Sequence, residues 1–167
     1  MIIKELEIKN QKALSDLIDE IEETLESGEY WLPINDISRE HFFDKEWTRF
    51  YGAFEDGELI AAAGLFLNPH EFGESLSQLG DAAPLINMTA EIGRAMVKPA
   101  YRGKNILLDI NRRITEEAAR LNKAYLIATI HPNNMPSQRS FMRLGMKRML
   151  TYKKSCGYIR DIYLMEI

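Results

Sequence analysis

The sequence predicts a mixed α/β fold, in which helices cover the faces of one central sheet. Residues 102–122 carry apolar side chains at helical spacing, and residues 124–130 form a nearly all-apolar run typical of a strand buried on both faces. Residues 48–67 contain two apolar runs around the turn Glu55-Asp56-Gly57-Glu58, which is typical of a hairpin. Along the chain, the expected order is strand, two helices, hairpin, strand, helix, strand, helix and two strands.

Length and composition limit the classes of protein to consider. The 167 residues predict a single domain spanning 1–167, and the 46% apolar and 28% charged shares are typical of a soluble globular protein. The net charge of −4 argues against a general nucleic-acid coat. No apolar run is long enough to span a membrane, and the start lacks a signal-peptide shape. The single cysteine fits a reducing compartment, so we expect a cytoplasmic protein. Together with the charge and the apolar runs, this indicates a protein without membrane or nucleic-acid partners. A homodimer is one option. The three histidines lack metal-ligand spacing, so no metal site is expected.

The first elements are predicted from alternation and capping signals. Residues 2–8 alternate apolar and charged side chains, which predicts a short strand with Ile2, Leu6 and Ile8 on one face. Asn10 is a typical N-cap for a helix whose apolar stripe runs to Leu25. The opposite face of this helix is acidic, which indicates solvation or, alternatively, a weak attraction for a cationic substrate.

An aromatic loop, Glu29–Pro33, follows the first helix, which is expected to end at Gly28. Binding residues lie disproportionately on loops, so Tyr30 and Trp31 are candidates for substrate binding. Ser38 is expected to begin a second, shorter helix that holds Phe42, Phe43 and Trp47.

The middle of the chain predicts a hairpin of strands 48–54 and 59–67. Residues 68–85 are too long for a plain connector and are expected to form a short helix or a flap. A central strand is expected over 86–97, ended by Pro99.

The last third predicts a helix over 102–122 and the buried strand 124–130. Asn134 is expected to cap a helix that ends at Gly145. Two antiparallel strands, 146–154 and 158–166, complete the sheet.

The stretch from Glu91 to Leu107 joins the central strand to a basic, glycine-containing turn and then to a helix. Free backbone N–H groups at such a helix start, together with Arg102 and Lys104, favour a phosphate or pyrophosphate. The alternative is an ordinary strand-to-helix loop with solvated charges.

Two motifs in this order resemble a known family. The run Val97-Lys-Pro-Ala-Tyr-Arg-Gly-Lys-Asn-Ile-Leu107 resembles the acyl-CoA-binding motif of the GNAT superfamily of N-acetyltransferases. The run Asn134-Met-Pro-Ser137, followed by Phe141 and Gly145-Met146, is similar to the family's second signature. The resemblance implies a GNAT-like fold and transfer of an acetyl group from acetyl-CoA to a small-molecule or peptide amine.

The resemblance also implies roles for individual residues. The backbone near Met96 and Val97 would face the pantetheine arm and the acyl carbonyl, and Asn134 and Ser137 would contact that arm. The pyrophosphate would lie on Arg102, Gly103, Lys104, Asn105, Ile106 and Leu107.

This sequence departs from the family pattern at three positions. Asn105 and Leu107 stand where small residues are usual. Phe141 is placed at the cofactor, where many members carry a tyrosine that protonates the thiolate.

The acetyl transfer needs a group that removes the proton of the amine. Glu91 is the candidate base, because its spacing to Arg102 is similar to that of the catalytic glutamate in one branch of the family; the alternative is a structural carboxylate. Tyr152 is a candidate acid on a late strand. Two other functions are compatible with the residues: an acyl-CoA-binding module without turnover, and an unrelated nucleotide-binding protein.

Overall fold

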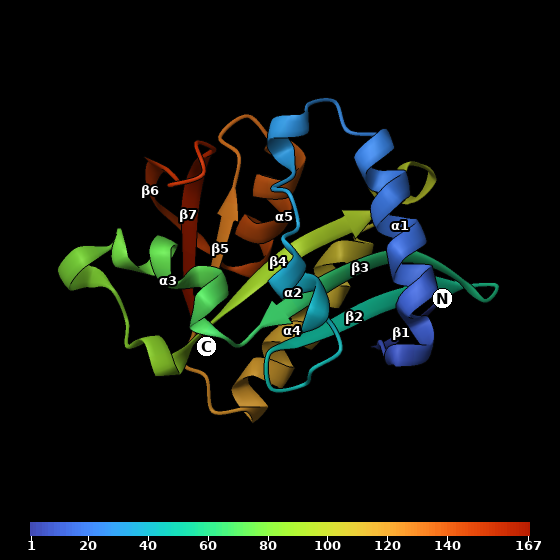
Figure 1. Cartoon of the computed structure of the whole chain (residues 1–167), viewed down its shortest axis with the longest axis horizontal. Helices are drawn as coiled ribbons and strands as arrows, with labels where there is room; N and C mark the ends of the chain where they lie inside the picture. Colours follow the sequence, from blue (N-terminus) through green and yellow to red (C-terminus); the bar gives the residue numbers. More distant parts are fainter.

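The computed structural model describes residues 1–167 as a seven-stranded sheet flanked by helices (Figure 1). The strand order is β1-β2-β3-β4-β5-β7-β6, and only the pair β4–β5 is parallel. The mixed α/β fold class is therefore confirmed. The strands are β1 Ile2–Glu5, β2 Thr48–Glu55, β3 Glu58–Phe66, β4 Thr89–Val97, β5 Tyr125–Ile130, β6 Lys147–Lys153 and β7 Ile159–Glu166. The helices are α1 Gln11–Glu23, α2 Asp36–Glu40, α3 Pro69–Ser77, α4 Ile106–Arg120 and α5 Met135–Leu144.

The helices form two layers, one on each face of the sheet. On one face, α1 packs with Phe42 against Phe50, Ala62 and Phe66 of β2 and β3. On the opposite face, α4 and Phe141 of α5 pack against alternate residues of the same strands, including Ala61 and Ala63. Figure 1 shows α1 and α2 in front of the strands and α4 behind them. None of the helices combines the length and the hydrophobicity that a membrane-spanning segment needs.

The N-terminal expectations were partly wrong. β1 ends at Glu5 and a 3-10 turn follows, so Ile2 and Ile8 are exposed and only Leu6 of the expected apolar face is buried. Asn10 lies at the predicted N-cap position of α1, but its side chain makes no capping hydrogen bond to this helix. Its side chain accepts a hydrogen bond from the Glu7 N–H at 3.0 Å and closes the preceding 3-10 turn instead.

The second helix is shorter than predicted. Asn35 caps α2 by accepting a hydrogen bond from the Ser38 N–H at 2.7 Å, and α2 ends at Glu40. The aromatic residues expected inside it lie in the following turns, where Phe42 packs edge-on against Phe50. Packing against the sheet, rather than helical spacing, therefore places these rings. Residues 68–85 do contain a helix, α3, capped by Asn68, as one of the two alternatives predicted.

The sheet opens at its centre, between β4 and β5. Their pairing covers only residues 89–91 and 125–127, so the rest of β4 has no partner on that side. A β-bulge bends β4 where Gly64 pairs with Gly93 but Ala62 pairs with Met96. Arg94 lies in this bulge with φ of +52°, in the left-handed region. Residues 86–88, expected in this strand, form a 3-10 turn before it.

Candidate functional site

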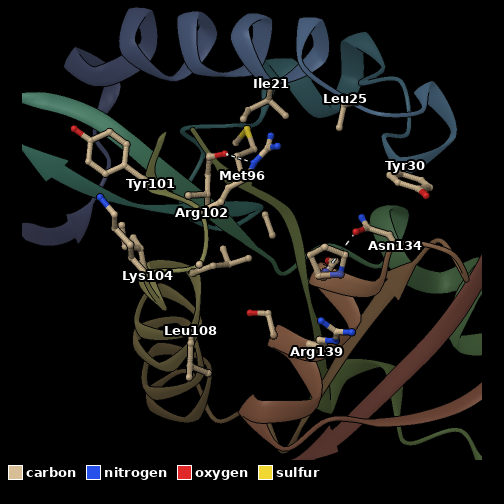
Figure 2. A pocket seen from close by; sticks show the side chains of 18 of the residues that line it. Ile21, Leu25, Tyr30, Met96, Tyr101, Arg102, Lys104, Leu108, Asn134 and Arg139 are labelled. Atoms are coloured by element: carbon tan, nitrogen blue, oxygen red, sulfur yellow. Dashed lines mark hydrogen bonds between the residues drawn. The ribbon is translucent and has the colours of Figure 1, made fainter. Parts of the chain in front are cut away.

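A cavity of about 410 Å³, the large cavity, lies at this opening. Its walls come from the end of β4, the start of α4, one face of α5, α1 and the aromatic loop (Figure 2). Figure 2 shows Met96, Arg102, Asn134 and Arg139 around the same space, although their elements are far apart in the sequence. Ten of the eleven residues expected to bind the cofactor line it: Met96, Val97, Arg102, Gly103, Lys104, Asn105, Ile106, Leu107, Asn134 and Ser137.

The start of α4 supplies free backbone donors to this cavity. The expected helix over 102–122 begins only at Ile106, because Gly103 and Asn105 have φ of +77° and +62°, outside the right-handed helix. α4 has no side-chain cap, which leaves the N–H groups of its first turn without partners. A Cβ at Gly103 would meet no atom within 4 Å, so the turn is open to a ligand on that side.

Asn105 takes the left-handed conformation that glycine usually supplies, and asparagine tolerates it better than most residues. Its side chain does not extend freely over the helix start, since its Oδ1 accepts a hydrogen bond from Arg143 of α5 at 2.6 Å. The departure from the glycine pattern is thus compatible with an open turn.

Four cations surround this end of the large cavity, namely Arg102, Lys104, Arg139 and Arg143. None of the four forms an ion pair with a carboxylate. With the dipole of α4, they make this end attractive for phosphate groups. Sequence reasoning missed Arg139 and Arg143, although their spacing of four residues on the predicted helix places them on one face.

A second cavity of about 130 Å³, the small cavity, adjoins the first. Glu91 and Phe141 line the small cavity. The expectation that Phe141 lies at the cofactor was wrong in that Phe141 does not line the large cavity. The ring of Phe141 is 2% exposed and belongs to the core. The residues that line both cavities are Tyr30, Trp31, Ala95, Asn134 and Ser137.

Glu91 is half-buried in the small cavity and is the last residue of β4 that pairs with β5. Burial raises the pKa of its carboxyl to about 7, and the negative charge of Glu71 adds to this rise. Lys154 and Arg94 oppose the rise in pKa with their positive charges. A carboxyl with this pKa exchanges a proton readily near neutral pH.

The aromatic loop is held over the opening by two arginines. Arg94 donates hydrogen bonds to the carbonyls of Leu32 and Pro33, and its guanidinium lies 5.2 Å from the ring of Trp31. From the other side, Arg160 donates to the Glu29 carbonyl at 2.7 Å. The loop thereby becomes a wall shared by the two cavities.

Tyr152 lines neither cavity. Its hydroxyl is 2.5 Å from Ser75 Oγ and 3.2 Å from the ammonium of Lys154. Other side chains of the small cavity, Glu71, Arg94, Lys154 and Arg160, were not predicted, because they come from four separate elements or turns and share no local motif.

Comparison with known proteins identifies the family. The model of the Acetyltransferase (GNAT) family matches residues 12–146, which include most of the chain. This chain belongs to the GNAT acetyltransferase family. The match includes both motifs and the strand that carries Glu91.

Solved structures support the GNAT fold. An N-acetyltransferase from Staphylococcus aureus superposes with a TM-score of 0.72 at 17% identity, covering 99% of this chain and 97% of that one. The Salmonella typhimurium protein yncA, solved with its cofactor acetyl-CoA, gives 0.70 at 18% identity over 100% and 92% of the two chains. A ribosomal-protein-alanine N-acetyltransferase from Brucella melitensis gives 0.69 at 19% over 100% and 99%. No curated protein sequence matches the chain.

Proposed function

We propose that this GNAT protein transfers an acetyl group from acetyl-CoA to a primary amine, by direct attack while both substrates are bound. One observation carries the proposal: a cavity with a phosphate-binding end meets a smaller cavity that contains a carboxyl whose pKa is near neutral. One of the five residues that line both cavities is Ala95, on the part of β4 that has no partner on the β5 side.

The residues of the large cavity fit acetyl-CoA. The uncapped start of α4 and the four unpaired cations suit its phosphates. The free edge of β4 offers backbone donors and acceptors to an amide-containing arm, and Asn134 and Ser137 lie across from that edge. Acetyl-CoA supplies the acetyl group as a thioester, whose C–S bond breaks as the amine nitrogen forms the new N–C bond.

Glu91 acts in this proposal as the general base. The ammonium form of the amine has no lone pair, so its proton must leave before attack. In its ionised form, Glu91 takes that proton, directly or through a water molecule. A backbone N–H of the free β4 edge near Met96 and Val97 polarises the carbonyl, as in an oxyanion hole.

The leaving group places little demand on an acid. A thiol has a pKa of about 8.5, so a thiolate is tolerable near neutral pH. Phe141 has no proton to donate, and Tyr152 lies outside both cavities. The lack of an acid at Phe141 is also the observation that favours the second candidate, an acyl-CoA-binding module without turnover.

Two measurements distinguish these candidates. Thermal shift with acetyl-CoA tests binding, because a ligand of the native state raises its stability. Release of CoA with a panel of amines tests turnover. An acetyltransferase gives both signals, whereas an acyl-CoA-binding module gives only the first.

A further inference from the structure

The small cavity contains more positive than negative side chains. Arg94, Lys154 and Arg160 line it, together with the carboxyls of Glu71 and Glu91. None of these five groups lies within ion-pair distance of an opposite charge. The five charges act on one another through space, but no direct ion pair among them has to be broken before a ligand binds.

Arg160 is the most deeply buried of the cations, with 2% of its surface exposed. Its two terminal nitrogens each donate a hydrogen bond of 2.7 Å to a backbone carbonyl, those of Ile159 and Glu29. Carbonyls satisfy N–H groups but bring no opposite charge. The Glu29 carboxylate acts on Arg160 only through space, and a buried guanidinium without a directly paired carboxylate is costly, which makes this end of the cavity favourable for an anion.

Lys154 adds a second positive charge from the same β6–β7 hairpin. Its ammonium is 3.2 Å from each of two neutral hydroxyl groups, those of Ser75 and Tyr152. These contacts use two of its three protons. Lys154 and Arg160 thus contribute two positive charges from one hairpin, while Glu91 lies on the central strand β4.

We propose, on the basis of the acetyltransferase function above, that the acceptor is a small amine that also carries a carboxylate or phosphate. Its amine faces Glu91, and its anionic group binds at Lys154 and Arg160. The cavity volume of about 130 Å³ equals that of roughly four waters in the liquid, so only a short molecule or the end of a longer one fits. A polyamine is disfavoured, because its further ammonium groups would meet these unpaired cations.

Binding measurements on the wild-type protein test this acceptor class without relying on turnover. Calorimetry in the presence of saturating CoA compares β-alanine with β-alaninamide, and O-phosphoethanolamine with ethanolamine. We expect the anionic member of at least one pair to bind more than about tenfold tighter, and the pair concerned distinguishes carboxylate from phosphate. Equal affinities within both pairs, or tighter binding of spermidine than of either anionic amine, would overturn the proposal.

A pair of lysine variants locates the anion. Lys154→Met removes a cation from the cavity, whereas Lys153→Met removes the neighbouring, exposed lysine, which does not line it. The preference for the anionic amine should fall about tenfold or more in Lys154→Met and stay at the wild-type value in Lys153→Met. Equal preferences in the two folded variants would exclude this binding position.

The same probes separate this inference from the proposed function. Acetylation of ethanolamine but not of either anionic amine would support the acetyltransferase and contradict the acceptor class. Tight binding of an anionic amine without any acetylation would support the binding position and contradict the acetyltransferase.

Discussion

Replacing Glu91 by glutamine tests the central step of the proposed mechanism. The substitution keeps the shape of the side chain and removes its ability to take a proton. General-base catalysis typically contributes about 100-fold or more, so turnover should fall by at least that factor. Acetyl-CoA affinity should stay unchanged, because Glu91 lines only the small cavity.

The pH dependence gives a sharper test than the rate at one pH. Burial and Glu71 raise the pKa of Glu91 to about 7, against the opposing charges of Lys154 and Arg94. The base form therefore increases as pH rises through about 7, and kcat/KM of the wild type should rise over the same range. The glutamine variant should lack this step, and its deficit should shrink at high pH, where the amine is already neutral.

The stability of the fold should fall over the same pH range in which kcat/KM rises. Folding favours the protonated form of Glu91, so the free energy of unfolding falls as pH rises from about 4.5 to about 7. The difference between these two pKa values corresponds to about 3 kcal/mol. Glu91→Gln should remove that loss, which urea unfolding at acidic and alkaline pH would detect.

A matched control is Glu116→Gln on the exposed face of α4, where 68% of the side chain is exposed. This variant should keep both the wild-type rate and the wild-type dependence of stability on pH. CoA release measured with an active amine decides the outcome for Glu91. A Glu91→Gln variant with the wild-type rate across the pH range would refute the role of Glu91 as base.

Three further predictions concern the large cavity and the core. Gly103→Pro replaces a φ of +77° by about −65° and removes an N–H, so acetyl-CoA affinity measured by calorimetry should fall more than about tenfold; an unchanged affinity in a folded variant would exclude the phosphate site. Asn105→Gly should bind acetyl-CoA as tightly as wild type in a thermal-shift assay, while Asn105→Val should bind more weakly, because a β-branched residue is strained at φ of +62°. Phe141→Tyr should raise turnover by less than about tenfold if its hydroxyl reaches the sulfur, and Phe141→Ala should cost roughly 3–5 kcal/mol in urea unfolding, because the ring is 2% exposed.

Features that depend only on neighbours along the chain could be predicted from the sequence. Gly57 permits the hairpin turn with φ of +84°, and Gly145 ends α5 with φ of +113°. Asn134 caps α5 by accepting a hydrogen bond from the Ser137 N–H at 3.4 Å. The basic turn before α4 was recognisable as a phosphate-binding motif for the same reason, because its donors come from consecutive residues.

Short-range signals failed where packing competes with them. Asn10 lies at the N-cap position of α1, yet its side chain accepts a hydrogen bond from the Glu7 N–H and closes the preceding turn instead. The aromatic residues after Ser38 have helical spacing, yet the need to bury Phe42 against Phe50 places them in turns. In both cases, a competing contact outweighs a propensity of about 1 kcal/mol or less.

The chemistry of the small cavity depends on contacts between distant parts of the chain, which local patterns do not encode. Pairing between β4 and β5 stops after Glu91, and no local pattern encodes the register of two strands that are separated by a helix. The pKa of Glu91 depends on charges that arrive from α3, the β4 bulge and the β6–β7 hairpin. Electrostatic interactions depend on distance through space, and that distance is fixed only when the whole sheet has assembled.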